Sequence, residues 1–354
     1  MTTKNMTGFC GKLCLVLILV ALSFMATGSL VAAASAKEQG KVFKWKLSNT
    51  LPANDISAQG CAVFCKMVNE RSKGRLIIRP YWVNELCPVS ENFDALSRGA
   101  FQMAGGSSTY WVGKDPYLHV VVGLPYAYAD NYPLQLMAHR KYGLDQLTKE
   151  WYAKHNQYFL GYSPSGIHGL MSNKPLRTVA DFKGLKARAT GPQAMLLAKL
   201  GAAPLWLSGA EIPTAMRLGT IDATTWTLQA WSEMQMREYA KYYCLPPLGS
   251  MVVDMTVNMD AWKLLPDDLK KIVEWSYDDW AIYNMTHYNF VEQKQLNELQ
   301  KKEPSRISML APEDQKILMK LSIEVWDEVA AKNPLAAEGV KRVKKMLRDV
   351  GKIE

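Results

Sequence analysis

Residues 186–226 read KARATGPQAMLLAKLGAAPLWLSGAEIPTAMRLGTIDATTW, and this segment carries the main indication of the fold. Its pattern predicts strand, turn, helix, turn, strand, helix, turn and strand in that order. Gly201 stands where the first helix needs its C-terminal cap, and Gly219 ends the second helix. Strands that alternate with helices indicate an α/β fold with a mostly parallel sheet, whose ligands bind at the carboxyl ends of the strands.

Arg188 follows the first of these strands, among small residues and with no carboxylate nearby in the sequence. A guanidinium group in such a place is suited to grip an anion through two parallel hydrogen bonds. The alternative is an arginine in a surface ion pair, and the residues alone leave both interpretations open.

Three segments in this part of the chain carry a family resemblance. They are DFKGLKAR (181–188), LGAAP (200–204) and EIPTAMRLGTID (211–222). In this order and spacing the chain resembles the substrate-binding proteins of TRAP transporters, which are bacterial extracytoplasmic solute receptors. The resemblance implies a two-lobed periplasmic binding protein fold with a ligand cleft between the lobes and a long helix that spans the hinge. It also implies a small organic acid as ligand and TRAP membrane permease subunits as partners.

The first 36 residues differ from the rest of the chain. Their only charges are Lys4 and Lys12, an apolar run begins at Leu13, and Ala34-Ser35-Ala36 closes the segment. This pattern predicts a secretory signal peptide, cut before Lys37, and therefore a periplasmic protein; a retained membrane anchor is the alternative. No later apolar run reaches about 18 residues, the length of a membrane-spanning helix.

The composition narrows the class of partner. The formal net charge is +9, and the basic residues are scattered without one dense run. A diffuse positive excess favours organic anions over nucleic acid as partners. Four cysteines follow the leader: Cys61, Cys65, Cys87 and Cys244. Cys87 could pair with Cys61 or Cys65, or all four could be small buried side chains.

The rest of the chain predicts two lobes joined by crossing strands. Lobe I comprises residues 41–163 with 251–290, and lobe II comprises residues 164–250 with 291–354. A long helix is predicted from Pro266 to Lys302, because apolar side chains recur at helical spacing after Pro266-Asp-Asp. Further predicted elements are strands at 44–48, 75–80, 101–104, 159–162, 168–173 and 252–258, and helices at 55–72, 90–98, 133–155 and 312–350. Asn49 and Ser107 follow the first and third of these strands, where ligands of a parallel sheet bind.

No catalytic motif is present. The five histidines share no metal-ligand spacing, and the chain has neither a GxSxG elbow nor the lysine of a phosphate loop after Gly105-Gly106. The sequence therefore predicts a binding protein without a cofactor. A receptor of another transporter or sensor system and a secreted hydrolase are the alternatives, and the oligomeric state stays open.

The resemblance also suggests which residues shape the site. Arg188 falls at the family's carboxylate-binding arginine. Trp226 matches the keto-acid group, whose preceding residue is an acidic metal-ligand candidate; here that residue is Thr225, which puts a metal-bridged ligand in doubt. His168 stands where sialic-acid receptors have a second arginine. Gly209 replaces an aromatic residue of some members and is expected to widen the wall, with Trp206 or Trp231 stacking instead. Core packing is the alternative for any one of these tryptophans.

Overall fold

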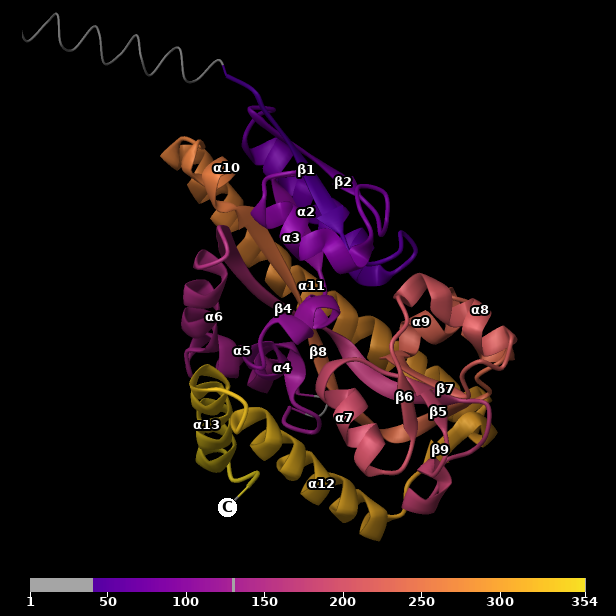
Figure 1. Ribbon diagram of the computed structural model, residues 1–354. Coiled ribbons are helices and arrows are strands. Elements are labelled where there is room, and N and C mark those ends of the chain that lie inside the picture. The colour runs from indigo at the N-terminus through magenta and orange to yellow at the C-terminus, as the bar shows by residue number, and fades with distance from the viewer. Residues whose placement is uncertain (1–40, 129–130, 354) are drawn as a thin grey trace, which may run out of the picture.

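The computed structural model describes residues 41–128 and 131–353, so the predicted leader lies outside the described residues. One nine-stranded sheet runs through the molecule in the order β2-β1-β3-β8-β4-β7-β5-β6, with β9 beside β8 (Figure 1). The strands are β1 (Phe43–Asn49), β2 (Leu76–Tyr81), β3 (Met103–Gly106), β4 (Gln157–Ser172), β5 (Lys186–Arg188), β6 (Ala203–Leu205), β7 (Ala223–Thr227), β8 (Tyr242–Asn258) and β9 (Ile307–Met309). The predicted α/β class is confirmed.

Twelve α-helices connect and cover these strands in the described part of the chain. They are α2 (Ile56–Arg71), α3 (Asn92–Ser97), α4 (Tyr117–Gly123), α5 (Tyr132–Arg140), α6 (Leu144–Ala153), α7 (Gly191–Lys199), α8 (Ile212–Arg217), α9 (Leu228–Glu233), α10 (Met259–Lys263), α11 (Asp267–Lys302), α12 (Pro312–Ala330) and α13 (Pro334–Asp349).

The order of elements predicted for residues 186–226 is confirmed. β5, α7, β6, α8 and β7 follow one another, and β5 pairs in parallel with β6 and with β7. Gly201 and Gly219 have φ values of 83° and 69°, the left-handed conformation that ends a helix and that glycine adopts without steric cost. The local signals of this stretch therefore agree with the elements that it forms.

β4 and β8 are much longer than predicted. They run antiparallel through the middle of the sheet, and their register shifts between Pro164 and Ile167, opposite residues 250–252. The predicted strands 159–162 and 168–173 are parts of one continuous strand, in which a β-bulge accommodates the glycine and proline residues between them. The bulge lies at the predicted boundary between the lobes, and β1–β3 and β5–β7 lie at opposite ends of the molecule (Figure 1).

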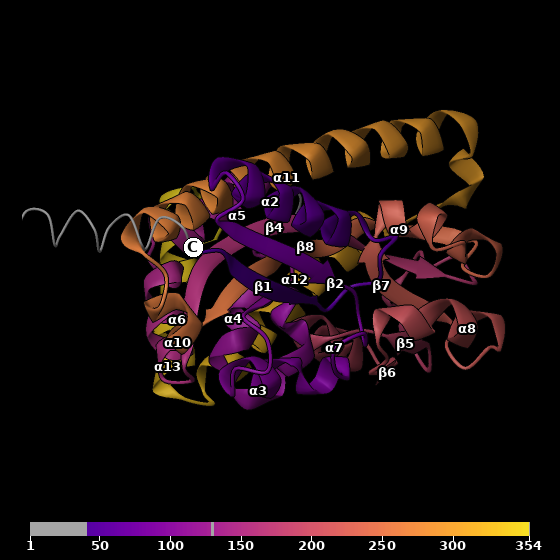
Figure 2. The same cartoon turned by 90° about the horizontal axis from the view of Figure 1, so that it is seen from above.

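The long helix α11 begins and ends within one residue of its prediction. Its 36 residues extend over about 54 Å at 1.5 Å per residue. It packs against α2 and β4 and also against α9, so it lies along both ends of the sheet (Figure 2). Its buried side includes Leu269, Val273, Tyr277 and Trp280, which are four of the residues at helical spacing.

Two predicted helices are interrupted. Residues 133–155 form α5 and α6, which meet at Gly143 with φ of 81°, and residues 312–350 form α12 and α13, where the Asn333 side chain caps α13. α13 packs on α4, α5 and α6, which belong to residues 41–163. α12 packs on both α7 and α4 and so leads the chain to this position of α13. The grouping of residues 291–354 with the second lobe stays a prediction.

The four cysteines of the described chain are free thiols in the structure. Cys61, Cys65 and Cys244 are buried and Cys87 is half-buried, so the structure shows the alternative of unpaired, mostly buried side chains. Across the described residues, no helix has both the length and the apolar character needed to cross a membrane.

Candidate functional site

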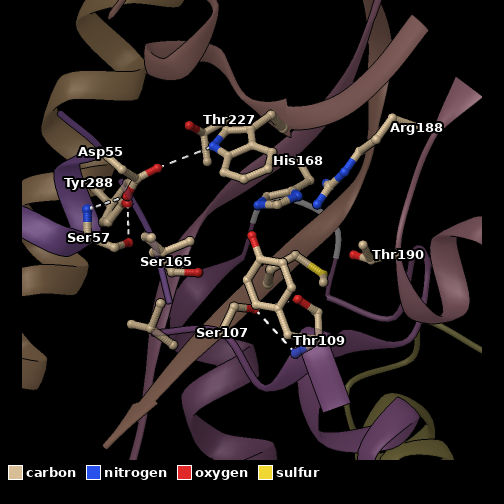
Figure 3. Close-up of a pocket in the computed structure, with 15 residues that line it drawn as sticks. Asp55, Ser57, Ser107, Thr109, Ser165, His168, Arg188, Thr190, Thr227 and Tyr288 are labelled. Carbon is tan, nitrogen blue, oxygen red and sulfur yellow. Dashed lines mark hydrogen bonds between the residues drawn. The ribbon is translucent and has the colours of Figure 1, made fainter. Parts of the chain in front are cut away.

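A cavity lies between the part of the sheet that contains β1–β3 and the part that contains β5–β7. The space inside it, including the part open to solvent, is about 400 Å³, which suits a small molecule. Its walls are Leu51, Asp55, Ser57, Ser107, Thr109, Tyr110, Ser165, His168, Arg188, Thr190, Trp226, Thr227, Met251, Val253 and Tyr288. Figure 3 shows the polar members of this group pointing toward one another from both ends of the sheet.

Arg188 lies at the carboxyl end of β5 and is 2% exposed. Its Nε donates to the Leu207 carbonyl at 3.0 Å, and its Nη1 donates to the Thr225 carbonyl at 3.4 Å. The guanidinium carbon lies 4.8 Å from the centre of the Trp226 ring, a cation–π contact. These contacts fix the direction of the side chain and leave further N–H groups for a ligand.

Among the described residues, no acidic side chain balances the charge of Arg188. No Asp or Glu lies within ion-pair distance of it across residues 41–128 and 131–353. Burial lowers the pKa of the guanidinium, but the unperturbed pKa of arginine is so high that the group stays charged. A buried and unpaired cation is costly, so this arrangement favours an anionic ligand.

His168 projects from β4 beside Arg188. Its ring stacks against Trp226 with centroids 6.2 Å apart and planes inclined by 21°. Burial, and then the positive charge of Arg188, lowers the pKa of His168 to about 3. The imidazole is therefore neutral near pH 7, where it can donate one hydrogen bond and accept another.

The other end of the cavity is formed by residues before and within α2. The Asp55 carboxylate caps this helix by accepting from the Ser57 backbone N–H at 2.8 Å, and it also accepts from Trp226 Nε1 at 3.3 Å. Burial raises the pKa of Asp55. Tyr110 supplies a second link between the ends, because its hydroxyl accepts from the Gly209 backbone N–H at 3.3 Å.

Four of the seven predicted site residues line this cavity: Ser107, His168, Arg188 and Trp226. The other three lie outside its lining. The Asn49 side chain is buried and accepts from the Leu51 backbone N–H. The Thr225 side chain is buried, and only its carbonyl reaches the site, through Arg188. Trp206 is 51% exposed and packs edge-on against Tyr110.

Gly209 does not widen the wall in the expected way. A Cβ atom at this position would lie 2.4 Å from Cη2 of Trp226, so the indole already fills the space that a side chain would take. Trp231 lies in the core, 1% exposed, and donates to the Ala240 carbonyl. In this conformation the Trp231 ring therefore cannot stack on a ligand in the cavity.

Asp55, Ser165, Thr190, Thr227 and Tyr288 are wall residues that the sequence did not identify as site residues. Asp55 is the first residue of the helix predicted at 55–72, and a helix cap accounts for an aspartate in that place. The others are single hydroxyl-bearing residues without a motif, and only the meeting of distant segments identifies them.

The cavity offers few ligands for a metal ion. Asp55 is the one carboxylate among the described wall residues, and it is already engaged by Ser57 and Trp226. Within residues 41–128 and 131–353, no group of three or more His, Cys, Asp or Glu side chains could hold a metal. Calcium prefers six to eight oxygen ligands with several carboxylates, so these residues do not fit such a site.

The described residues form a small polar cavity between the two parts of one sheet, an arrangement that can enclose a small solute. The family model for bacterial extracellular solute-binding protein, family 7 (DctP), matches residues 47–333, and the chain belongs to this family of TRAP transporter substrate-binding proteins.

Three relatives illustrate the similarity. The monocarboxylate 2-oxoacid-binding periplasmic protein of Nostoc sp. strain PCC 7120 is 27% identical over 304 residues, covering 82% of this chain and 80% of that protein. A TRAP periplasmic solute-binding protein of Pseudoalteromonas atlantica, solved with sodium and pyruvate, is 30% identical with a TM-score of 0.77, covering 88% of this chain and 95% of that one. Its counterpart from Colwellia psychrerythraea, solved with calcium and pyruvate, is 28% identical with a TM-score of 0.79 and the same coverage of both chains.

Proposed function

We propose that this chain captures a small organic monocarboxylate in the periplasm and delivers it to a TRAP-type membrane permease. The observation that carries the proposal is Arg188, a buried guanidinium in a small cavity with no acidic partner among the described residues. A ligand carboxylate would supply the missing charge and accept the remaining N–H groups in a two-pronged contact.

The cavity favours one carboxylate over two. Arg188 is the single Lys or Arg side chain among the described wall residues, and His168 is neutral near pH 7. A second ligand carboxylate would therefore be buried without a cation, which is costly. The relatives described as binding 2-oxoacids or pyruvate support the same ligand class.

Ligand binding is proposed to favour closure of the two lobes. Two hydrogen bonds already bridge the cleft, from Trp226 Nε1 to Asp55 and from the Gly209 N–H to Tyr110. A ligand held by Arg188 on one side and by residues of the other end would make its extra contacts only in the closed state. The bulge in β4 at residues 164–167 is the proposed hinge.

Catalysis is not part of the proposal. A histidine with a pKa of about 3, such as His168, is a weak general base at neutral pH. The predicted leader is proposed to direct the chain to the periplasm, where a TRAP permease would be its partner. A receptor of another transporter or sensor system is the alternative. TRAP permease genes adjacent to the gene for this chain would favour the TRAP receptor.

A thermal-shift screen with a panel of organic acids tests the ligand class. A ligand at 100 times its Kd stabilises the folded state by about 2.7 kcal/mol, which is a clear rise in Tm. We expect small monocarboxylates to raise Tm, and their amides, such as lactamide, to leave it unchanged because they lack the charge. Equal shifts for acids and amides, or no shift with any carboxylate, would contradict the proposed function.

A further inference from the structure

Asp55 is a second ionisable group in the cavity, and helix capping does not use all of its hydrogen-bonding capacity. Its side chain is 4% exposed and lines the same cavity as Arg188. No Lys, Arg or His side chain pairs with it in the described chain. An ionised carboxylate has about four acceptor positions. The backbone N–H groups of Ser57 and Ala58 and the Trp226 indole use three of them and leave room for another donor.

Asp55 and Arg188 lie at opposite ends of the group of wall residues in Figure 3. Trp226 joins them, because the guanidinium stacks over its ring while its Nε1 donates to Asp55. A small ligand whose carboxylate contacts Arg188 would therefore have its remaining atoms beside the indole, in the direction of Asp55.

The charges of the cavity make this second contact selective. A 2-oxo acid on Arg188 would bring only acceptor oxygens to Asp55, and a dicarboxylate would bring a second negative charge. A hydroxyl or ammonium group would instead donate to the carboxylate, and buried polar groups need such partners. Sites built to hydrogen-bond an OH or NH group discriminate strongly against analogues that lack it.

We propose that Asp55 contacts the ligand and selects small carboxylic acids that carry a hydroxyl or ammonium group over 2-oxo acids and dicarboxylates of the same size. This inference rests on the proposed function, in which Arg188 holds the ligand carboxylate. It assigns to Asp55 a role in specificity in addition to its role as the cap of α2.

Titration calorimetry with matched acids tests the inference. The probes are pyruvate, lactate and alanine, followed by the 2-oxo, 2-hydroxy and 2-amino acids with four carbons, so that each series differs only at C2. We expect the hydroxy or the amino acid to bind wild type at least about tenfold more tightly than the oxo acid, the effect of one hydrogen bond to a charged group. Tighter binding of the amino acid identifies an ammonium group, and tighter binding of the hydroxy acid identifies a hydroxyl.

The Asp55→Asn variant keeps a side chain that caps helices as well as aspartate does, and it removes the charge. We expect it to abolish the preference for the donor-bearing acid, while binding of the oxo acid is retained. Asp55→Ser, which also caps helices, serves as the second variant if the first does not fold.

Trp226→Phe separates contact from positioning, because it removes the indole N–H while leaving the Asp55 carboxylate in place. A ligand-contacting Asp55 predicts that Trp226→Phe keeps the preference. The inference is overturned if Trp226→Phe loses the preference as Asp55→Asn does, if wild type binds the oxo acids equally or more tightly, or if the Asp55 variants leave the preference unchanged. In each of these cases the protein would still bind carboxylates, so the proposed function would stand. If none of the six acids binds, the inference is overturned and the proposed function is contradicted for ligands of this size.

Discussion

Replacing Arg188 by alanine is the most direct test of the site. The substitution removes the cation and its two hydrogen bonds, to the carbonyls of Leu207 and Thr225. In the liganded state it would leave the ligand carboxylate buried without a partner. Breaking a buried charge pair in this way costs about 3–5 kcal/mol, which is about two to three and a half decades in Kd.

The unliganded protein should respond differently. There the substitution loses two hydrogen bonds of about 1 kcal/mol each, but it also removes a charge that is buried without a counter-ion. Because these effects oppose each other, we expect the Tm of the unliganded variant to stay within a few degrees of wild type. A large loss of affinity with little loss of stability is the signature of a ligand contact.

Tryptophan fluorescence is a suitable readout, since Trp226 lies against the guanidinium. Arg188→Lys should recover only part of the affinity, because charge returns without the planar pair of donors. Lys186→Ala is the matched control: it removes a positive charge from the same strand, but this side chain is exposed and donates to the Gly219 carbonyl. Binding by Arg188→Ala within threefold of wild type, or an equal loss in Lys186→Ala, would refute the assignment.

Three further predictions concern the surroundings of the cavity. Burial, and then the positive charge of Arg188, lowers the pKa of His168 to about 3. The unfolded chain therefore binds more protons between pH 3 and 6.5, and the stability of the fold falls as the pH is lowered through this window. His168→Gln should lessen that fall when Tm is measured against pH. Burial raises the pKa of Glu292 to about 8. The folded chain therefore binds more protons between pH 4.5 and 8, and the stability of the fold falls as the pH rises through this window. Glu292→Gln should lessen the decline in Tm from about pH 5 to 9, and an unchanged decline would contradict this prediction. Gly209→Ala should push the Trp226 ring aside and weaken ligand binding by at least about tenfold, whereas Gly113→Ala, where an added Cβ meets nothing within 4 Å, should bind as wild type.

Much of the fold could be predicted from the sequence, because its signals are local. The order of elements between Lys186 and Trp226 follows from apolar spacing and from glycines at helix ends, and both act within a few residues. The start and end of α11 follow from the same kind of signal. The unbroken course of β4 does not, because residues 161–166 have the composition of a turn and only pairing with the distant β8 holds them in a strand.

The sequence likewise indicates some residues of the candidate site correctly and others not. Arg188 and Trp226 could be proposed from the sequence, because they stand in or beside segments with a recognisable order and spacing. Trp206 stands in that stretch as well, yet its side chain is largely exposed. Sequence places a residue along the chain, but the direction of its side chain depends on which elements pack around it.

Local patterns in the sequence set the class of fold and the order of elements in its central stretch, and the family resemblance singled out the arginine that lines the cavity. Asp55 is separated from Arg188 by more than a hundred residues, and packing of the whole chain brings both to one cavity with Trp226 as a shared neighbour. The physical reason is that helix and strand signals depend on near neighbours, whereas a cavity forms where side chains from distant segments are packed together and excluded from water.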